Sequence, residues 1–109
     1  MQPISVIICS LNPRSDYLRR VLDSLQSQTL PVSQWELLLV DNGSEHPLED
    51  SWNLSWHPHH RHVRETEPGL TAARLRAIKE ATGDLLVFVD DDNILAPDYL
   101  ATALEIRRS

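Results

Sequence analysis

The sequence predicts an α/β fold with a mostly parallel sheet and helices on both faces. Three apolar runs, at residues 4–9, 35–40 and 85–89, have the continuous hydrophobicity of strands buried on both faces. Segments with helical spacing separate the runs, and such alternation is typical of right-handed crossovers between parallel strands. Each run ends on a polar turn, so these turns are expected together at one edge of the sheet.

Length and composition limit the classes of protein to consider. The chain has 109 residues, enough for a single α/β domain that we expect to span residues 1–109. A hydrophobic content of 41% and a net charge of −6 argue against disorder and against nucleic acid as a partner. The sequence shows neither a signal peptide nor a membrane-spanning run, so we expect a cytoplasmic location, which includes the inner face of a membrane.

The first predicted strand, residues 4–9, contains the one cysteine of the sequence, Cys9, which we expect to be a buried and reduced thiol. A turn follows, and then a helix with Ser15 or Asp16 as its candidate N-cap. The helix is expected to end near residues 28–29. Its apolar side chains recur at helical spacing and should face the sheet: Leu18, Val21, Leu22 and Leu25.

The second predicted strand, residues 35–40, ends on Asp41 and a turn of Asn, Gly and Ser. Polar turns at the carboxyl ends of strands bind ligands in open α/β sheets, so Asp41 is a candidate acceptor for a base or a ribose. Asp and Asn side chains also bond to their own backbone in turns. For Asp41 taken alone, turn chemistry is the favoured interpretation.

Residues 45–62 are the least informative part of the chain. Residues 45–50 are compatible with a short helix or a loop, and a short third strand is expected at residues 60–64. Four histidines lie close together, but they lack the cysteine partners and the regular spacing of a zinc site. We therefore interpret them as part of a mobile surface loop: His57, His59, His60 and His62.

The next helix is predicted from Leu70 to about Thr82, with Gly83 as its C-cap. Its apolar stripe consists of Leu70, Ala73, Ala77, Ile78 and Ala81. Arg74 lies within this stripe, which is an unusual place for an arginine. Three explanations are open: a buried carboxylate partner, a ligand anion, which the nearby helix N-terminus favours over the first, and a structural, snorkelling arginine. Arg76 lies off the stripe and is expected in solvent.

Three consecutive carboxylates follow the last predicted strand, residues 85–89. Because alternate strand residues share a side, Asp90 and Asp92 are expected about 7 Å apart. At an effective dielectric of about 20, the two charges repel by about 2.4 kcal/mol. A hard divalent cation, Mg²⁺ or Mn²⁺, would relieve the repulsion and keep positions open for phosphates. The alternative is a solvated acidic turn before a last helix that has Pro97 at its first position.

Several of these segments together resemble the family 2 glycosyltransferases. The matching segments are residues 5–12, 39–44, 69–74, 83–84, 89–92 and 97–100. The resemblance implies the GT-A fold, with a Rossmann-like nucleotide-binding half, and we expect the sheet order 3-2-1-4. The family transfers sugars from nucleotide-diphospho donors, usually with inversion and usually with Mg²⁺ or Mn²⁺. A UDP-sugar is the expected donor, and a carbohydrate or a lipid-linked molecule the expected acceptor.

The resemblance also implies roles for the matching residues. Nucleotide contacts are expected at Ser10, Leu11, Asn12, Asp41, Arg74, Asp90 and Asp91. Asp41 would contact the base, and Arg74 the base or the diphosphate. Asp90 and Asp92 would be the ends of an Asp-x-Asp motif that holds the metal, with Asp92 the more direct ligand and Asp90 nearer the ribose.

The chain departs from the family pattern in sequence and in length. Members often have Pro at the position of Cys9, an aromatic residue at that of Leu11 and Asn at that of Leu75, which leaves the identity of the base open. The family's catalytic domain is longer, and its later half supplies the acceptor surface and the catalytic base. We therefore expect residues 1–109 to be the donor-binding half, inactive alone, with the base beyond Ser109.

Other classes fit the sequence less well. A receiver domain requires acidic residues directly after the first strand, where residues 10–12 are Ser, Leu and Asn. A dinucleotide-binding oxidoreductase or a nucleotidyltransferase requires a glycine-rich loop there, and the chain has three glycines in all. The remaining alternative to an active transferase is a non-catalytic sugar-nucleotide-binding or interaction module of the same fold.

Overall fold

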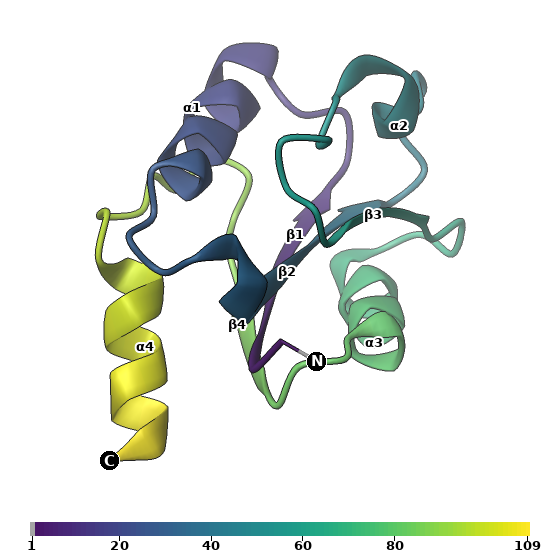
Figure 1. Cartoon of the computed structure of the whole chain (residues 1–109). Helices are drawn as coiled ribbons and strands as arrows, with labels where there is room; N and C mark the ends of the chain where they lie inside the picture. The colour runs from purple at the N-terminus through teal and green to yellow at the C-terminus, as the bar shows by residue number, and fades with distance from the viewer. Residues whose placement is uncertain (1) are drawn as a thin grey trace.

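The chain is organised around a four-stranded, fully parallel sheet in the order β3-β2-β1-β4 (Figure 1). The computed structural model describes residues 2–109. The elements are β1 (Ile4–Ser10), α1 (Ser15–Gln26), η1 (Val32–Gln34), β2 (Trp35–Asp41), α2 (Leu48–Ser51), β3 (His60–Arg64), α3 (Leu70–Glu80), β4 (Leu85–Phe88) and α4 (Tyr99–Arg108). The predicted strand order is confirmed, as is the third strand, and the undecided segment after β2 contains the short helix α2.

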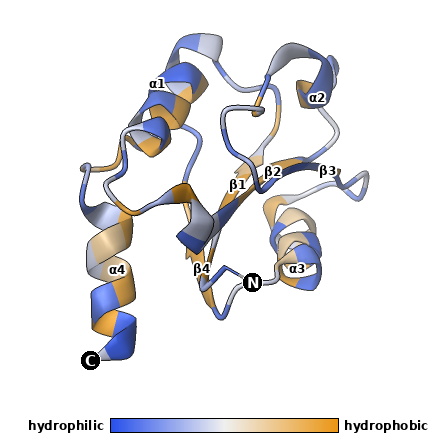
Figure 2. Ribbon diagram, in the orientation of Figure 1, coloured by the Kyte–Doolittle hydropathy of each residue, from blue (hydrophilic) through white to orange (hydrophobic). Residues whose placement is uncertain are grey.

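The two faces of the sheet carry different layers. Because successive strand residues point to opposite faces, Ile8 packs beneath α1 and α4, whereas Ile7 packs beneath α3. Figure 1 shows α3 on the side of the sheet away from α1 and α4. Figure 2 shows hydrophobic residues along the central strands and hydrophilic ones along most of β3, which is an edge strand. The prediction of helices on both faces is confirmed.

The predicted stripe of α1 is fully buried, but the ends of the helix differ from expectation. Arg14 occupies the N-cap position without a side-chain cap, and Ser15 and Asp16 already lie within the helix. The carboxylate of Asp16 instead pairs with the guanidinium of Arg14 at 3.4 Å. The helix ends at Gln26, two residues earlier than predicted. Among residues 2–109, no helix has both the length and the apolar character that a membrane crossing requires.

The helix α3 contacts the sheet through a narrower strip than its sequence predicted. Only Ala73 and Ala77 are buried, while Leu70 and Ile78 are each 51% exposed. Arg74 is likewise exposed rather than on the inward face. The alanines allow close approach to the strands, so the larger side chains beside them remain at the rim. Arg76 is not simply solvated, because it forms ion pairs with two glutamates, Glu65 and Glu80.

Gly83 is not the C-cap of α3, because the helix ends at Glu80 and an extended residue follows. A Cβ atom at Gly83 would lie 2.7 Å from backbone atoms of both Ile4 and Ser5. The glycine is therefore required for close approach of the chain to β1. Pro97 is also displaced from its predicted place, since it precedes α4, which begins at Tyr99.

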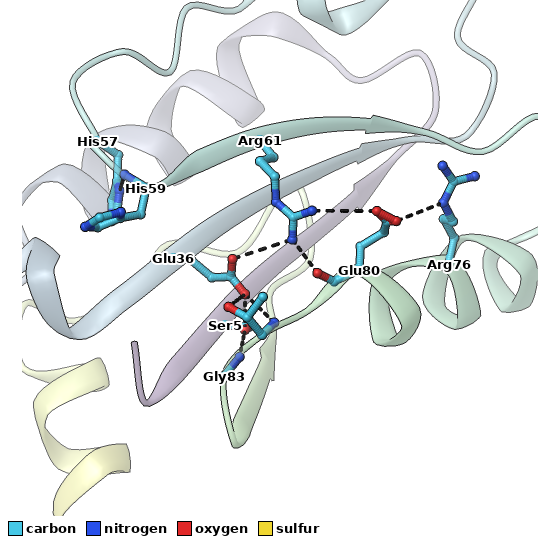
Figure 3. A network of polar contacts seen from close by, with 9 residues as sticks. Ser5, Glu36, His57, His59, Arg61, Arg76, Glu80 and Gly83 are labelled. Carbon is cyan, nitrogen blue, oxygen red and sulfur yellow. Dashed lines mark hydrogen bonds and ion pairs between the residues drawn. The ribbon is translucent and has the colours of Figure 1, made fainter. Parts of the chain in front are cut away.

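A closed polar network fixes the amino edge of the sheet (Figure 3). Glu36 is 5% exposed, and its carboxylate accepts hydrogen bonds from Ser5 Oγ at 2.5 Å and from the N–H and hydroxyl of Thr82 at 2.7 and 2.9 Å. Arg61 lies between Glu36 and Glu80 at 3.6 Å from each carboxylate. Burial alone would raise the pKa of Glu36, but the hydrogen bonds and Arg61 together lower it.

The histidine segment is not the mobile surface loop that the sequence suggested, because His57 is completely buried. Its ring packs edge-on against Trp35 at a centroid distance of 4.2 Å, and its Nδ1 accepts a hydrogen bond from the His59 N–H at 2.9 Å. Burial lowers the pKa of His57 to about 4. The residue is therefore a neutral core side chain beside the amino edge.

Candidate functional site at the carboxyl edge

The carboxyl ends of the parallel strands bring the predicted site residues together. Ser10 at the end of β1 is in register with Asp41 at the end of β2, and β4 runs parallel on the other side of β1. The hydroxyl of Ser10 donates to Asp91 Oδ2 at 2.6 Å. The expected placement of Asp41 and of the acidic residues on one edge is confirmed.

The acidic residues form a turn rather than the end of a strand. β4 ends at Phe88, and the N–H of Asn93 donates to the carbonyl of Asp90 at 3.1 Å, which closes a β-turn. Asp90 and Asp92 therefore do not share one side of a strand, and that prediction is wrong. The expectation that the strand is buried on both faces is also wrong, because β4 is an edge strand and Phe88 is 41% exposed.

Asp90 and Asp92 nevertheless remain open to solvent, while the Asp91 carboxylate is bonded to Ser10. Within residues 2–109, none of the three forms an ion pair, and no set of three or more His, Cys, Asp or Glu side chains is arranged to hold a metal. Mg²⁺ is usually held by one or two carboxylates together with water and substrate phosphates. Asp90 and Asp92 are two exposed carboxylates of the kind that such a cation uses, and the described residues do not form a metal site from protein ligands alone.

Asp41 is engaged in turn chemistry, the interpretation that its sequence favoured. Its Oδ1 accepts from the N–H of Ser44 at 2.8 Å, and its Oδ2 accepts from the N–H of Leu48 at 3.0 Å and from Arg64 Nη1 at 3.0 Å. Burial would raise the pKa of Asp41, but these bonds and the charge of Arg64 lower it overall. A base contact by Asp41 remains a prediction.

Asn12 connects the loop after β1 to the loop after β2. Its N–H donates to Ser44 Oγ at 2.8 Å, and its Oδ1 accepts from the N–H of Glu45 at 2.9 Å. Its positive φ of 46° is tolerated because asparagine adopts the left-handed region more readily than most residues. The neighbouring Leu11 is 53% exposed, so an apolar surface is available beside this connection.

A hollow of about 190 Å³ opens at the carboxyl edge beside the start of α3. It is lined by Cys9, Ser10, Leu11, Asn42, Gly69, Leu70 and Ala73. Cys9 is a free thiol as expected, but it is half-buried rather than buried, and its burial raises its pKa. The nearby charge of Arg74 acts in the opposite direction on this pKa. We call this space, defined by its seven lining residues, the donor hollow, after the ligand that we propose for it in the next section.

A larger hollow of about 570 Å³ is lined by Asn12 and by residues of the loops that lead into α1 and α2 and of these two helices. Its walls include Arg19, Glu45, His46 and Trp52. None of the acidic-turn residues lines it. The donor hollow is the better candidate because it contains Ser10, which is hydrogen-bonded to the acidic turn.

The sequence did not single out two residues of this edge. Arg64 holds Asp41 and also donates to the carbonyl of Ser44 at 3.3 Å, but a lone arginine in a short strand gives no local signal for such a role. Asn42 was expected as a turn residue, yet its side chain bonds to the distant loop before α3. These roles depend on which loops the sheet order brings together.

An all-parallel α/β sheet with polar loops and an acidic turn at its carboxyl edge is an architecture that many nucleotide-binding proteins share, with the ligand at that edge. The model of the family described as glycosyl transferase family 2 matches residues 5–106. The chain therefore belongs to glycosyltransferase family 2 and has the GT-A fold.

Curated relatives agree with this assignment. The chain is 30% identical over 92 residues to glycosyltransferase AglE of Haloferax volcanii, covering 82% of this chain and 30% of the relative. It is 33% identical over 103 residues to a poly(ribitol-phosphate) beta-glucosyltransferase of Bacillus spizizenii, covering 89% of this chain and 16% of the relative. The chain thus spans less than a third of the length of either protein.

Solved structures show the same fold with nucleotides bound. TarS of S. aureus, residues 1–349 in complex with UDP, superposes with a TM-score of 0.86 at 25% identity, over 99% of this chain and 32% of that one. The mannosyltransferase PcManGT from Pyrobaculum calidifontis, in complex with GDP-Man and Mn²⁺, gives a TM-score of 0.82 at 29% identity, over 94% of this chain and 31% of that one.

Proposed function

We propose that this chain binds the nucleotide of a nucleotide-diphospho-sugar donor together with Mn²⁺ or Mg²⁺, for an enzyme that transfers the sugar to an acceptor hydroxyl with inversion. The observation that carries the proposal is the hydrogen bond between Ser10 and Asp91, at 2.6 Å. It links the donor hollow to the exposed acidic turn, so base and diphosphate have adjacent places to bind. Relatives that bind UDP and GDP-Man support the proposal.

Each part of the nucleotide has a candidate partner at this edge. Leu11 offers an apolar surface for the base, with Asn12 and Asp41 fixing the surrounding loops. Arg74 is exposed and lies close enough to influence Cys9 in the donor hollow, so its charge can assist a diphosphate. Asp90 and Asp92 would hold the cation. A divalent cation bound there would stabilise negative charge on the departing diphosphate.

The test is calorimetric titration of the 109-residue chain with UDP and with GDP, with and without Mn²⁺. We expect weak binding that Mn²⁺ strengthens, and that chelation or Asp92→Asn reduces about tenfold, equivalent to about 1.4 kcal/mol. Asp84→Asn is the matched control, because Asp84 is an exposed carboxylate that precedes β4 at the opposite edge. Equal affinity in the wild type and Asp92→Asn, in the presence of Mn²⁺, would contradict the cation bridge.

We propose further that these 109 residues alone transfer no sugar. Inverting transfer requires a base within hydrogen-bond reach of the attacking hydroxyl. Among the carboxylates at the ends of β2 and β4, Asp41 and Asp91 are already hydrogen-bonded, and Asp90 and Asp92 are assigned to the cation. Acceptor-dependent release of nucleoside diphosphate by the chain, with Mn²⁺ and a panel of nucleotide sugars, would disprove this.

A non-catalytic sugar-nucleotide-binding module is the second candidate function. It would bind the same nucleotides, because it uses the same edge of the sheet. A turnover assay on the full-length gene product separates the two, since only the transferase consumes donor in the presence of an acceptor.

A further inference from the structure

Asn42 connects the edge of the sheet to the loop that precedes α3. Its backbone N–H donates to the carbonyl of Ser10 at 2.9 Å, directly after the last paired residues of β1 and β2. Its side-chain Nδ2 donates to the carbonyls of Glu65 at 3.1 Å and Glu67 at 2.8 Å. Its Oδ1 accepts from the N–H of Gly69 at 3.2 Å. Both donors and the acceptor of the side-chain amide are thus hydrogen-bonded to one loop.

This loop ends on the residue that starts α3. Gly69 has φ 112° and ψ 147°, a conformation that residues with a side chain rarely adopt, and its carbonyl accepts from the N–H of Ala73 at 3.2 Å. Gly69, Leu70 and Ala73 form the α3 side of the donor hollow, and Asn42 itself lines it. The position of that wall therefore depends on where the loop is held.

The other contacts of the loop act mainly on its first residue. The N–H of Glu65 donates to the carbonyl of Asp41 at 2.9 Å, and the Glu65 carboxylate pairs with Arg76 at 3.7 Å. The same carboxylate accepts from the N–H of Glu67 at 3.0 Å, which is a bond within the loop. In the described part of the chain, Asn42 provides the side-chain bonds that tie Glu67 and Gly69 to the sheet.

We infer that Asn42 is a positioning residue for the donor nucleotide, holding the residue 65–69 loop and the first turn of α3 at the separation from β1 that the nucleotide requires. The inference rests on the proposed function of the donor hollow. Asn42 acts through Gly69 and Leu70 and is not required to touch the nucleotide. An aspartate has the same shape but no N–H, so it would face the carbonyls of Glu65 and Glu67 with an oxygen.

The test compares Asn42→Asp with the wild type by calorimetric titration with UDP and Mn²⁺. Both proteins are kept at a temperature at which each is fully folded. At about pH 7.5 the variant should bind about tenfold more weakly, because ionised aspartate cannot donate to the loop. At about pH 5 the ratio of the two affinities should shrink, since a carboxyl placed against carbonyl oxygens is more readily protonated and then donates one bond. The ratio cancels the effect of pH on the nucleotide itself.

Asn53→Asp is the matched control, because Asn53 is exposed and its Oδ1 accepts from the nearby N–H of Ser55. It introduces the same charge and should leave the affinity ratio near one at both pH values. If Asn42→Asp does not fold, Asn42→Ala replaces it, with the same loss at about pH 7.5 and no recovery at about pH 5. Amide hydrogen exchange at Gly69 gives a readout without nucleotide, and it should accelerate in Asn42→Ala, which removes the oxygen that accepts from this N–H.

The outcomes separate the inference from the proposed function. A purely structural role would lower the unfolding free energy but leave the affinity of the folded variant equal to that of the wild type, which would overturn the inference. Unchanged exchange at Gly69 in Asn42→Ala would also overturn it. Failure of the wild type to bind UDP or GDP with Mn²⁺ would refute the proposed function and the inference with it, whatever the exchange data show.

Discussion

The carboxylates at the two edges of the sheet differ in burial and in the number of their partners. At the amino edge, Glu36 is buried, accepts three hydrogen bonds and faces the guanidinium of Arg61 (Figure 3). At the carboxyl edge, Asp90 and Asp92 are exposed, and within residues 2–109 neither forms an ion pair. At the amino edge, protein groups compensate the charge of the carboxylate. The acidic turn retains charge that a cation with phosphate can neutralise.

Asp41 shows that location alone does not decide the role of a carboxylate. It lies at the carboxyl edge, yet it resembles Glu36 in being buried and held by two backbone N–H groups and an arginine. The comparison therefore distinguishes groups that fix the loops from groups left free for a ligand. Asp41 and Asn42 belong to the first kind, and Asp90 and Asp92 to the second.

The largest effect on stability is expected from Glu36→Ala. The change leaves Ser5 and the N–H of Thr82 without their acceptor and Arg61 without its buried partner, so the unfolding free energy should fall by about 4 kcal/mol. Unfolding in urea measures this loss of unfolding free energy. Glu80→Gln is the control, because its carboxylate is more exposed, and it should cost less than 1 kcal/mol, as is usual for a surface ion pair. Equal losses in the two variants would contradict the closed network.

The next effect is a dependence of stability on pH that originates at the amino edge. His57 has its pKa lowered from 6.5 to about 4, so the unfolded chain binds a proton that the folded protein does not. Its stabilising contribution is complete above pH 6.5 and is lost as the pH falls toward 4, by about 3 kcal/mol. The lowered pKa values of Glu36 and Asp41 add to acid sensitivity only below their ordinary values of 4.5 and 3.8.

His57→Phe checks this assignment, because phenylalanine keeps the packing against Trp35 without a titrating group. The slope of unfolding free energy between pH 6.5 and 4 should flatten in this variant and persist in His46→Gln, which alters an exposed histidine that does not contribute to the lowered pKa of His57. A slope that persists in His57→Phe would place the titrating group elsewhere.

The strands and the α1 stripe were predictable because they depend on local patterns. Continuous apolar runs predict β1 and β2, and the alternation of strands with helices predicts a parallel sheet. The stripe of α3 was not predictable in the same way, since Leu70 and Ile78 are exposed although their spacing is helical. Burial on that face depends on how closely two alanines bring the helix to the sheet, which periodicity does not report.

A smaller effect is expected from Arg64→Gln at the carboxyl edge. The change removes one of the causes that lower the pKa of Asp41, while the backbone N–H bonds to the carboxylate remain. The side chain of Arg64 is 45% exposed, so the loss of unfolding free energy should be about 0.5 to 1 kcal/mol and should shrink in high salt. Unfolding in urea at low and high salt measures it; a loss insensitive to salt would contradict an electrostatic origin.

The sequence predicted which residues lie at the carboxyl edge, but it did not predict which residues contact one another there. The predicted ends of the strands placed Ser10, Asp41 and the acidic turn at one edge, because parallel strands run in the same direction. The partners of Asp41 and Asn42 come from loops at residues 44–48 and 65–69, and no local pattern pairs these segments. Gly83 illustrates the same limit, because its neighbours belong to β1.

Paramagnetic broadening of amide NMR signals by Mn²⁺ in the presence of UDP tests the contrast between the edges directly. Signals of residues 10–12 and 90–93 should broaden most, while those of Thr82 and Gly83 should lose the least intensity, because β4 separates the two edges by about 3.3 Å per residue. Asp92→Asn should remove the selective broadening. Broadening concentrated at Glu36 and Thr82, or spread evenly over both edges, would contradict a cation site at the acidic turn.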